Sequence, residues 1–265
     1  MPTTFNLSIL NSDEAFDRIY PEYIQEKSNV FWTPFEIGMR AAELLVDHEK
    51  TKVLDIGSGV GKFCLIGATH TKGIFHGIEQ RKHLVELCNE LASTHHVERV
   101  KFIHNNINRV DFSSYDAFYL YNPFFESLHQ ADKLDDSILH IQNHFEVYNL
   151  YVKAQFASLP VGTKIVTYHG FYDEIPLSYR AIKKEFDNKL ILWVKQPNDE
   201  ERLYFKEKIL GTCVKALRED GFANVNEQNI LIDPMLRYIS EKIILSQLGV
   251  NPVLDEVIED LLRNR

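Results

Sequence analysis

Residues 53–64 read Val-Leu-Asp-Ile-Gly-Ser-Gly-Val-Gly-Lys-Phe-Cys, and this stretch decides the fold. The apolar residues around Asp55 are typical of a short buried strand, and glycines at 57, 59 and 61 follow before an apolar helical run begins. The stretch therefore predicts a strand, a tight turn and the start of a helix. Glycine is required where the backbone has positive φ or lies directly against a ligand, so such a turn usually holds a small molecule.

Two nucleotide-binding patterns do not fit this turn. The dinucleotide fingerprint requires a glycine at the sixth position counted from Gly57, where this chain has Lys62. The phosphate-binding loop Gly-x-x-x-x-Gly-Lys-Ser/Thr fails at its first and last positions, which are Ile56 and Phe63. The carboxylate of Asp55 would repel a pyrophosphate but suits a ligand that carries an ammonium and a sulfonium charge. S-adenosylmethionine is such a ligand.

The turn resembles motif I of the class I S-adenosylmethionine-dependent methyltransferases, whose form apolar-x-Asp-x-Gly-x-Gly-x-Gly is matched at Asp55, Gly57, Gly59 and Gly61. The resemblance extends over residues 33–195. It implies an α/β fold with a doubly wound, seven-stranded, mostly parallel, Rossmann-like sheet that binds the cofactor across the carboxyl ends of its strands. A glycine-rich turn that serves another Rossmann-like ligand, or none, is the alternative.

Three domains are expected from this resemblance and from helical patterns outside it. Residues 1–32 would form an N-terminal helical cap, in which Asn11-Ser12-Asp13 begins a helix. Residues 33–197 would form the S-adenosylmethionine-binding methyltransferase domain, and residues 198–265 a C-terminal helical appendage with a helix stop at Gly221 and helices at 234–248 and 252–262.

The second predicted strand, residues 74–78, ends in Glu79, which lies 24 residues after Asp55. An acidic residue at this place can accept hydrogen bonds from both ribose hydroxyls of an adenosine. It corresponds to motif II of the family, and the resemblance also places Ser58 and Gln80 in the cofactor site. A surface glutamate at a strand end is the alternative.

The third predicted strand, residues 100–104, runs into Asn105-Asn106-Ile107. The family commonly has an aspartate here that accepts from the adenine amino group. The amide oxygen of Asn106 could replace it, with Ile107 packed on the adenine ring. An asparagine that only forms a turn is the alternative.

The fourth predicted strand leads into Asn122-Pro123-Phe124-Phe125. This segment resembles the Asp/Asn/Ser-Pro-Pro-Tyr/Phe loop of enzymes that methylate exocyclic adenine amines or amide nitrogens, which makes Asn122 a candidate catalytic and cofactor-binding residue. Phe124 replaces the second proline, whose ring would fix the direction of the loop carbonyl, so amino-methylation stays open. A strand-end turn with core aromatics is the alternative.

Thr33-Pro34 precedes a helix predicted at residues 34–48, with Thr33 as its cap and Pro34 at its first position. The dipeptide resembles motif X of the amino-methyltransferases, which lies near the methionine end of the cofactor. This resemblance adds Thr33 to the candidate cofactor-binding residues, and plain helix capping is the alternative.

Histidines give no metal site. His140 and His144 are four residues apart in a helix predicted at 137–159, but no third ligand is indicated, so we expect ordinary helix residues. After a strand predicted at 162–168, His169 is a candidate general base and Tyr172 a candidate wall of the acceptor pocket, although a lone histidine is more often structural. An antiparallel hairpin at 179–186 and 189–195 should close the sheet.

Composition limits the classes that remain. The 265 residues, 45% of them hydrophobic, suit one sizeable core, and without a leader-like segment or an apolar run near about 18 residues we expect a cytoplasmic protein with no membrane partner. Three scattered cysteines, at 64, 88 and 213, favour neither a disulfide framework nor structural zinc. A net charge of −9 argues against nucleic acid as a partner without excluding it.

The predicted function is that of an S-adenosylmethionine-dependent methyltransferase. A protein side chain is slightly favoured as acceptor, because the acidic balance would attract a basic segment and because residues 55–61 with Gly77-Ile78-Glu79 are similar to histone-lysine methyltransferases of the telomeric-silencing type. The alternatives are an N6-adenine-type nucleic-acid methyltransferase, a small-molecule methyltransferase and a catalytically silent S-adenosylmethionine-binding module.

Overall fold

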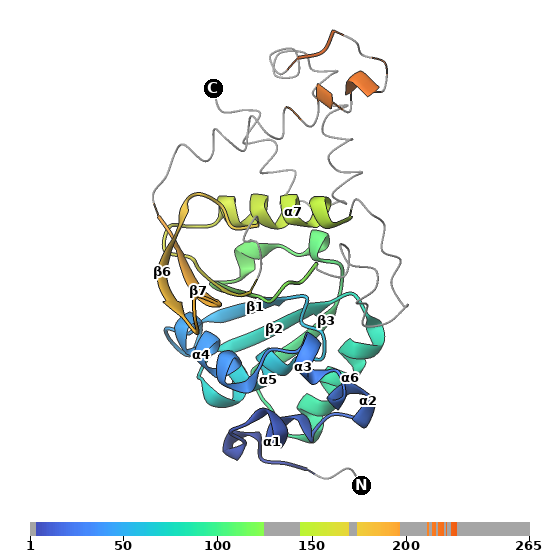
Figure 1. Ribbon diagram of the computed structural model, residues 1–265, viewed down its shortest axis with the longest axis vertical. Helices are drawn as coiled ribbons and strands as arrows, with labels where there is room; N and C mark the ends of the chain where they lie inside the picture. The colour runs from blue at the N-terminus through green and yellow to red at the C-terminus, as the bar shows by residue number, and fades with distance from the viewer. Residues whose placement is uncertain are drawn as a thin grey trace.

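The computed structural model describes residues 4–124, 144–169 and 174–196, together with residues 211, 214, 215, 217–219, 221 and 224–226. Its centre is a seven-stranded sheet in the order β3-β2-β1-β4-β5-β7-β6 (Figure 1). The strands are β1 (Lys52–Ile56), β2 (Ile74–Glu79), β3 (Val100–His104), β4 (Ala117–Leu120), β5 (Lys164–Tyr168), β6 (Tyr179–Glu185) and β7 (Leu190–Lys195). Strands β1 to β5 are parallel, whereas β7 is antiparallel to both of its neighbours. The predicted fold class and the closing hairpin are confirmed.

Helices cover both faces of the sheet. They are α1 (Asp13–Asp17), α2 (Glu22–Gln25), α3 (Ser28–Phe31), α4 (Phe35–Leu45), α5 (Lys62–His70), α6 (Lys82–Thr94) and α7 (His144–Ser158), with short 3-10 helices η1 (Leu7–Ile9), η2 (Ile107–Arg109) and η3 (Phe112–Ser114). One apolar cluster joins the sheet to α4, α5, α6 and the N-terminal helices, and a second joins it to α7 on the opposite face (Figure 1).

The burial of the strands follows from their places in the sheet. In the central strands, residues 53–56 of β1 and all four residues of β4 are buried, as expected of parallel strands covered on both faces. Strand β6 lies at the edge and exposes five consecutive residues from Arg180 to Lys184. Charged residues at such an edge discourage pairing with another chain.

The start of α4 differs from the prediction. Pro34 is the N-cap rather than the first helical residue, the helix ends at Leu45, and Pro34 has no side chain to cap it. The hydroxyl of Thr33 does not cap the helix either, because it is hydrogen-bonded to the Tyr119 hydroxyl at 2.9 Å. Instead the backbone N–H of Phe35 donates to Asp13 Oδ1 at 2.9 Å, so a carboxylate from α1 caps α4.

Several predictions lie outside the described residues. Residues 137–143 of the predicted long helix, with His140, and the helices at 234–248 and 252–262 are among them, as is Tyr172. Gly221 has φ of 99°, the left-handed conformation that suits the predicted helix stop. Within the ranges given above, no helix has both the length and the apolar character needed to cross a membrane.

Candidate cofactor and acceptor site

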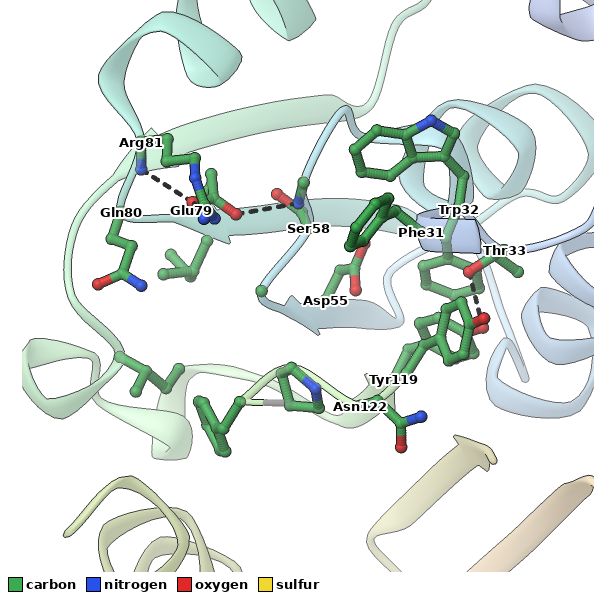
Figure 2. A pocket seen from close by; sticks show the side chains of 18 of the residues that line it. Phe31, Trp32, Thr33, Asp55, Ser58, Glu79, Gln80, Arg81, Tyr119 and Asn122 are labelled. Carbon is green, nitrogen blue, oxygen red and sulfur yellow. Dashed lines mark hydrogen bonds and ion pairs between the residues drawn. The ribbon is translucent and has the colours of Figure 1, made fainter. Parts of the chain in front are cut away.

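A cavity of about 470 Å³ opens at the carboxyl ends of the parallel strands β1 to β4 (Figure 2). This is the edge at which open α/β sheets bind their ligands. Its lining residues come from three places: the glycine turn, the ends of the neighbouring strands and the segment before α4. They are Phe31, Trp32, Thr33, Asp55, Gly57, Ser58, Gly59, Lys62, Phe63, Ile78, Glu79, Gln80, Arg81, Asn105, Asn106, Ile107, Tyr119, Tyr121, Asn122, Pro123, Phe124 and Tyr148.

Every candidate cofactor-binding residue except Gly61 lines this cavity. Gly61 has φ of 73° and is the N-cap of α5. A Cβ atom there would lie 2.4 Å from the ring of Phe102 and 3.0 Å from Cys88 Sγ. The third glycine of the pattern is therefore needed for core packing, and its contact with the cofactor stays a prediction.

The other two glycines let distant segments lie against the turn. Gly57 and Gly59 have φ of 75° and 53°, and a Cβ atom at either would come within 2.9 Å of another side chain. At Gly57 that neighbour is Pro123, and at Gly59 it is the ring of Trp32. Close approach by protein atoms adds to the backbone reason for glycine at both positions.

The carboxylate of Glu79 is buried and held in one orientation. Its Oε2 accepts the Gly59 N–H at 3.1 Å, its Oε1 accepts the Arg81 N–H at 2.8 Å, and an Arg81 guanidinium nitrogen lies 3.7 Å from Oε1. Burial raises the pKa of Glu79, and these hydrogen bonds and the arginine charge oppose the increase. The carboxylate of Glu79 at the end of β2 is therefore an oriented hydrogen-bond acceptor at one end of the cavity (Figure 2).

Asp55 is the buried acid near the middle of the cavity. The residue is only 4% exposed, and its Oδ2 accepts a hydrogen bond from Cys64 Sγ at 3.5 Å. Burial raises the pKa of Asp55 to about 7, the thiol opposes this and the charge of Glu79 adds to it. A cation in the cavity would favour the ionised carboxylate.

Asn106 forms a turn and also lines the cavity. Its Oδ1 accepts the backbone N–H of Asn108 at 3.2 Å, which is the contact expected of a turn-forming asparagine. Its Nδ2 donates to the Tyr148 hydroxyl at 2.7 Å. The rings of Tyr148 and Phe124 lie 5.3 Å apart. Together with the buried Ile107 they give this end of the cavity an apolar wall.

The opposite end is built from aromatic residues (Figure 2). Phe31 is the last residue of α3 and Trp32 follows it, and the indole N–H of Trp32 donates to the Ile24 carbonyl at 3.2 Å. Tyr119 from β4 stacks on Phe63 with ring centroids 3.9 Å apart. Sequence reasoning missed these walls, although aromatic residues next to Thr33 and Asn122 were the signal that could have found them.

Asn122 has φ of 42°, a conformation that asparagine tolerates better than most residues. It is exposed, and in Figure 2 its amide points away from Asp55. Pro123 lies over Gly57, and Phe124 belongs to the wall with Tyr148. Phe125, the last residue of the predicted loop motif, lies outside the described residues.

His169 lies near Tyr121, which lines the cavity, but is not itself among the lining residues. It has φ of 55°, and its ring centroid lies 4.5 Å from that of Tyr168 and 6.2 Å from that of Tyr121. Burial and the charge of Lys189 lower the pKa of His169. Across the described ranges, no three His, Cys, Asp or Glu side chains are grouped to hold a metal ion.

Solved structures with a similar shape include three methyltransferases. An RNA methyltransferase from Salinibacter ruber in complex with S-adenosyl-L-homocysteine is 20% identical with a TM-score of 0.44, over 63% of this chain and 94% of that one. An rRNA methylase from Streptococcus thermophilus is 14% identical with a TM-score of 0.40, over 62% and 94%. A geranyl diphosphate methyltransferase in complex with GPP and sinefungin is 16% identical with a TM-score of 0.36, over 49% and 43%.

The match to a protein family is more direct. No curated protein matches the chain. A family described as "Methyltransferase domain" matches residues 47–149, which contain the glycine turn, Glu79, Asn106 and the loop at Asn122. Residues 47–149 thus match a methyltransferase domain, which supports membership of the class I, Rossmann-like superfamily, whose methyl donor is S-adenosylmethionine.

Proposed function

We propose that this protein transfers the methyl group of S-adenosylmethionine to a basic side chain of a protein. The observation that carries the proposal is the pair of dissimilar ends in one cavity. Glu79, Gln80 and Arg81 lie at one end, and the aromatic residues around Thr33 lie at the other (Figure 2). A ligand with a polar nucleoside and a cationic tail matches this division.

At the polar end, Glu79 would accept hydrogen bonds from the ribose hydroxyls. Its two oxygens are already oriented by the N–H groups of Gly59 and Arg81, and a carboxylate can accept further donors besides these. The adenine ring would lie along Ile107 and Phe124, within reach of Asn106. In this proposal the nucleoside lies at the turns after β2 and β3.

At the aromatic end, Asp55 would balance the positive charge of the cofactor's methionine part. The bound sulfonium supplies an activated methyl group, so the protein needs only to align the acceptor and provide a path for one proton. The bond from sulfur to the methyl carbon breaks, a bond from the acceptor nitrogen forms, and the nitrogen releases a proton. Asn122 lies at the cavity wall and is the candidate to orient that nitrogen.

A cationic acceptor suits the charges and the rings at this end. Of the two cationic side chains among the described lining residues, Lys62 is paired with Asp13 and Asp17, and Arg81 lies beside Glu79. Aromatic faces such as those of Trp32 and Tyr121 attract ammonium groups. The net charge of −9 would also attract a lysine-rich segment rather than a phosphate backbone.

Methylation of an adenine amine is the second candidate, and Asn122-Pro123 favours it. Pro123 packs on the glycine turn, so the loop that would receive the amine is held beside the methyl donor. A small-molecule acceptor and a catalytically silent binding module are further candidates that the methyl-transfer experiment distinguishes.

The experiment is a methyl-transfer assay with isotope-labelled S-adenosylmethionine and four acceptor samples: a lysine-rich histone-type protein, single-stranded DNA, RNA and a metabolite extract. Asn122→Ala tests the acceptor loop, and Glu86→Ala, on the exposed side of α6, is the control. We expect label on lysine nitrogen with the parent protein and with Glu86→Ala, and a large loss with Asn122→Ala.

Three results would overturn the acceptor assignment. Label on adenine N6 would favour the nucleic-acid candidate, and label only on small molecules from a metabolite extract would favour the third. Binding of S-adenosylmethionine without transfer to any acceptor would support the silent module.

A further inference from the structure

Lys62 is a buried cation at an unfavourable place. It is the first residue of α5, directly after the glycine turn, and its side chain is only 2% exposed. A positive charge at the start of a helix is opposed by the helix dipole. Two carboxylates from α1 compensate, because Lys62 Nζ lies 2.5 Å from Asp13 Oδ1 and 2.6 Å from Asp17 Oδ1.

The same two carboxylates also accept hydrogen bonds from residues before and after Phe31, Trp32 and Thr33, the lining residues of the aromatic end. Asp13 Oδ1 accepts the Phe35 N–H at 2.9 Å, and Asp17 Oδ2 accepts the hydroxyl of Ser28. Ser28 Oγ also lies 3.5 Å from Lys62 Nζ. Ser28 and Phe35 are the two ends of segment 28–35, so the network centred on Lys62 holds that segment at both ends.

Segment 28–35 forms one wall of the cavity. Its Trp32 ring fills the space where a Cβ atom at Gly59 would lie, at 2.9 Å. Its Thr33 is hydrogen-bonded to Tyr119 at the carboxyl end of β4. Any displacement of the segment would therefore change the shape of the cavity next to the glycine turn.

Local helix stability cannot hold the segment in place. Helices α1, α2 and α3 have five, four and four residues, and helices of this length are unstable without tertiary contacts. A buried ion pair adds little net stability, but it does fix the relative positions of the elements that it joins. Lys62 joins α1 to the turn at which the cofactor would bind.

From this geometry we infer that Lys62 is a positioning residue. It holds segment 28–35 against the glycine turn and so keeps the aromatic end of the cavity in its cofactor-binding shape. The inference rests on the proposed function only where cofactor affinity is measured, because the position of the wall can be measured in the free protein.

The chain provides its own reporter. Its two tryptophans are Trp32 and Trp193, and Trp193 lies on β7 with its indole N–H bonded to Thr167. Trp193→Phe therefore leaves Trp32 as the single tryptophan, whose fluorescence can be excited selectively over that of tyrosine. Because Trp32 is 7% exposed, acrylamide should quench it weakly while the wall is in place.

In this background, Lys62→Met is compared with Lys82→Met. Lys82 is likewise the first residue of a helix, but it is 72% exposed and its partner Glu86 lies on the same helix. We expect Lys62→Met to raise the quenching constant of Trp32 by about threefold or more. If the wall is then in place about a tenth of the time, the affinity for S-adenosylhomocysteine falls about tenfold. Lys82→Met should change neither.

A second variant covers the case in which Lys62→Met does not fold because two carboxylates lose their counterion. The triple variant Asp13→Asn, Asp17→Asn and Lys62→Met removes the ion pairs without leaving a buried charge, and should show the same exposure of Trp32. If Trp32 stays as protected and S-adenosylhomocysteine binds as tightly as in the parent, the inference is wrong.

The outcomes separate this inference from the proposed function. If the Trp193→Phe parent binds no S-adenosylhomocysteine, the proposed function fails, while the quenching of Trp32 in the free protein still decides the role of Lys62. If the parent binds S-adenosylhomocysteine and quenching and affinity are unchanged in the folded Lys62 variants, the inference alone fails.

Discussion

The two ends of the cavity are built in different ways. The end at Glu79 combines local with longer-range contacts. The carboxylate accepts the N–H of Arg81 two residues later and Asn106 accepts that of Asn108, while Gly59 and Tyr148 contribute one hydrogen bond each from farther away. The aromatic end is held by contacts between residues far apart in the chain. Lys62 pairs with Asp13, 49 residues earlier, and Thr33 bonds to Tyr119, 86 residues later. Local contacts follow from a short sequence pattern, whereas the distant ones require the folded chain.

Asp55→Asn tests the buried charge between these ends and should have the largest effect. Burial raises the pKa of Asp55 from 3.8 to about 7, so between these values the folded protein keeps a proton that the unfolded chain releases. Unfolding therefore becomes more favourable as the pH rises. From about pH 5 to about pH 8 the parent should lose about 3 kcal/mol of stability relative to the variant.

Urea unfolding of both proteins across this pH range measures the difference. The difference should level off above the folded-state pKa, because both states of the parent are then ionised. Parallel stability curves for the parent and Asp55→Asn would contradict a raised pKa at this position.

Glu79→Ala tests the polar end of the cavity, which local contacts help to hold. It removes the acceptor of the Gly59 and Arg81 N–H groups and, in our proposal, of the ribose hydroxyls. We expect the affinity for S-adenosylhomocysteine to fall at least about 30-fold, which is about 2 kcal/mol, as judged by titration calorimetry. Glu86→Ala, at an exposed position on α6, is the control. Unchanged affinity in Glu79→Ala would show that the nucleoside binds elsewhere.

Thr33→Val tests the distantly built end. It keeps the shape of the side chain but leaves the buried hydroxyl of Tyr119 without its partner at 2.9 Å. We expect Thr33→Val to lose about 1 kcal/mol of stability in urea unfolding. Thr33→Ser keeps a hydroxyl at this position and should retain most of the parent's stability. Adding Tyr119→Phe to Thr33→Val should recover part of the loss, and the absence of any recovery would mean that this hydrogen bond does not hold the wall.

Tyr148→Phe should have the smallest effect. It removes the acceptor of Asn106 Nδ2, while the contact from Asn108 N–H still fixes the turn. We expect about a threefold loss of affinity for S-adenosylhomocysteine. Tyr151→Phe is the matched control, because Tyr151 is on the same helix and donates to the Val110 carbonyl. Equal losses in the two variants would argue against a specific role for Asn106.

The sheet could be predicted from the sequence because each strand has its own apolar pattern and its own turn residues. The predicted second and third strands coincide with β2 and β3 to within one residue, and Glu79 ends β2 as expected. The helix caps were less predictable. Thr33 has the residue type of a cap, yet its hydroxyl binds Tyr119 and the cap of α4 comes from Asp13 on another helix.

The glycine pattern shows why the site could be predicted only in part. Gly57, Gly59 and Gly61 all have positive φ, and the spacing of the glycines in the sequence does not distinguish one from another. Only the structure shows that Gly59 lies against Trp32 at the cavity whereas Gly61 lies against Phe102 in the core. Lys62 is a similar case, because its ion pairs depend on where α1 packs.

The central claim is that one cavity binds S-adenosylmethionine with its nucleoside at Glu79 and its cationic part at Asp55. The most direct test is titration calorimetry with S-adenosylmethionine at about pH 7 in two buffers of different ionisation enthalpy. The account predicts binding at one site with release of about half a proton, because the bound cation ionises Asp55, and no release in Asp55→Asn. Absence of binding, or binding with the same proton release in the parent and Asp55→Asn, would contradict it.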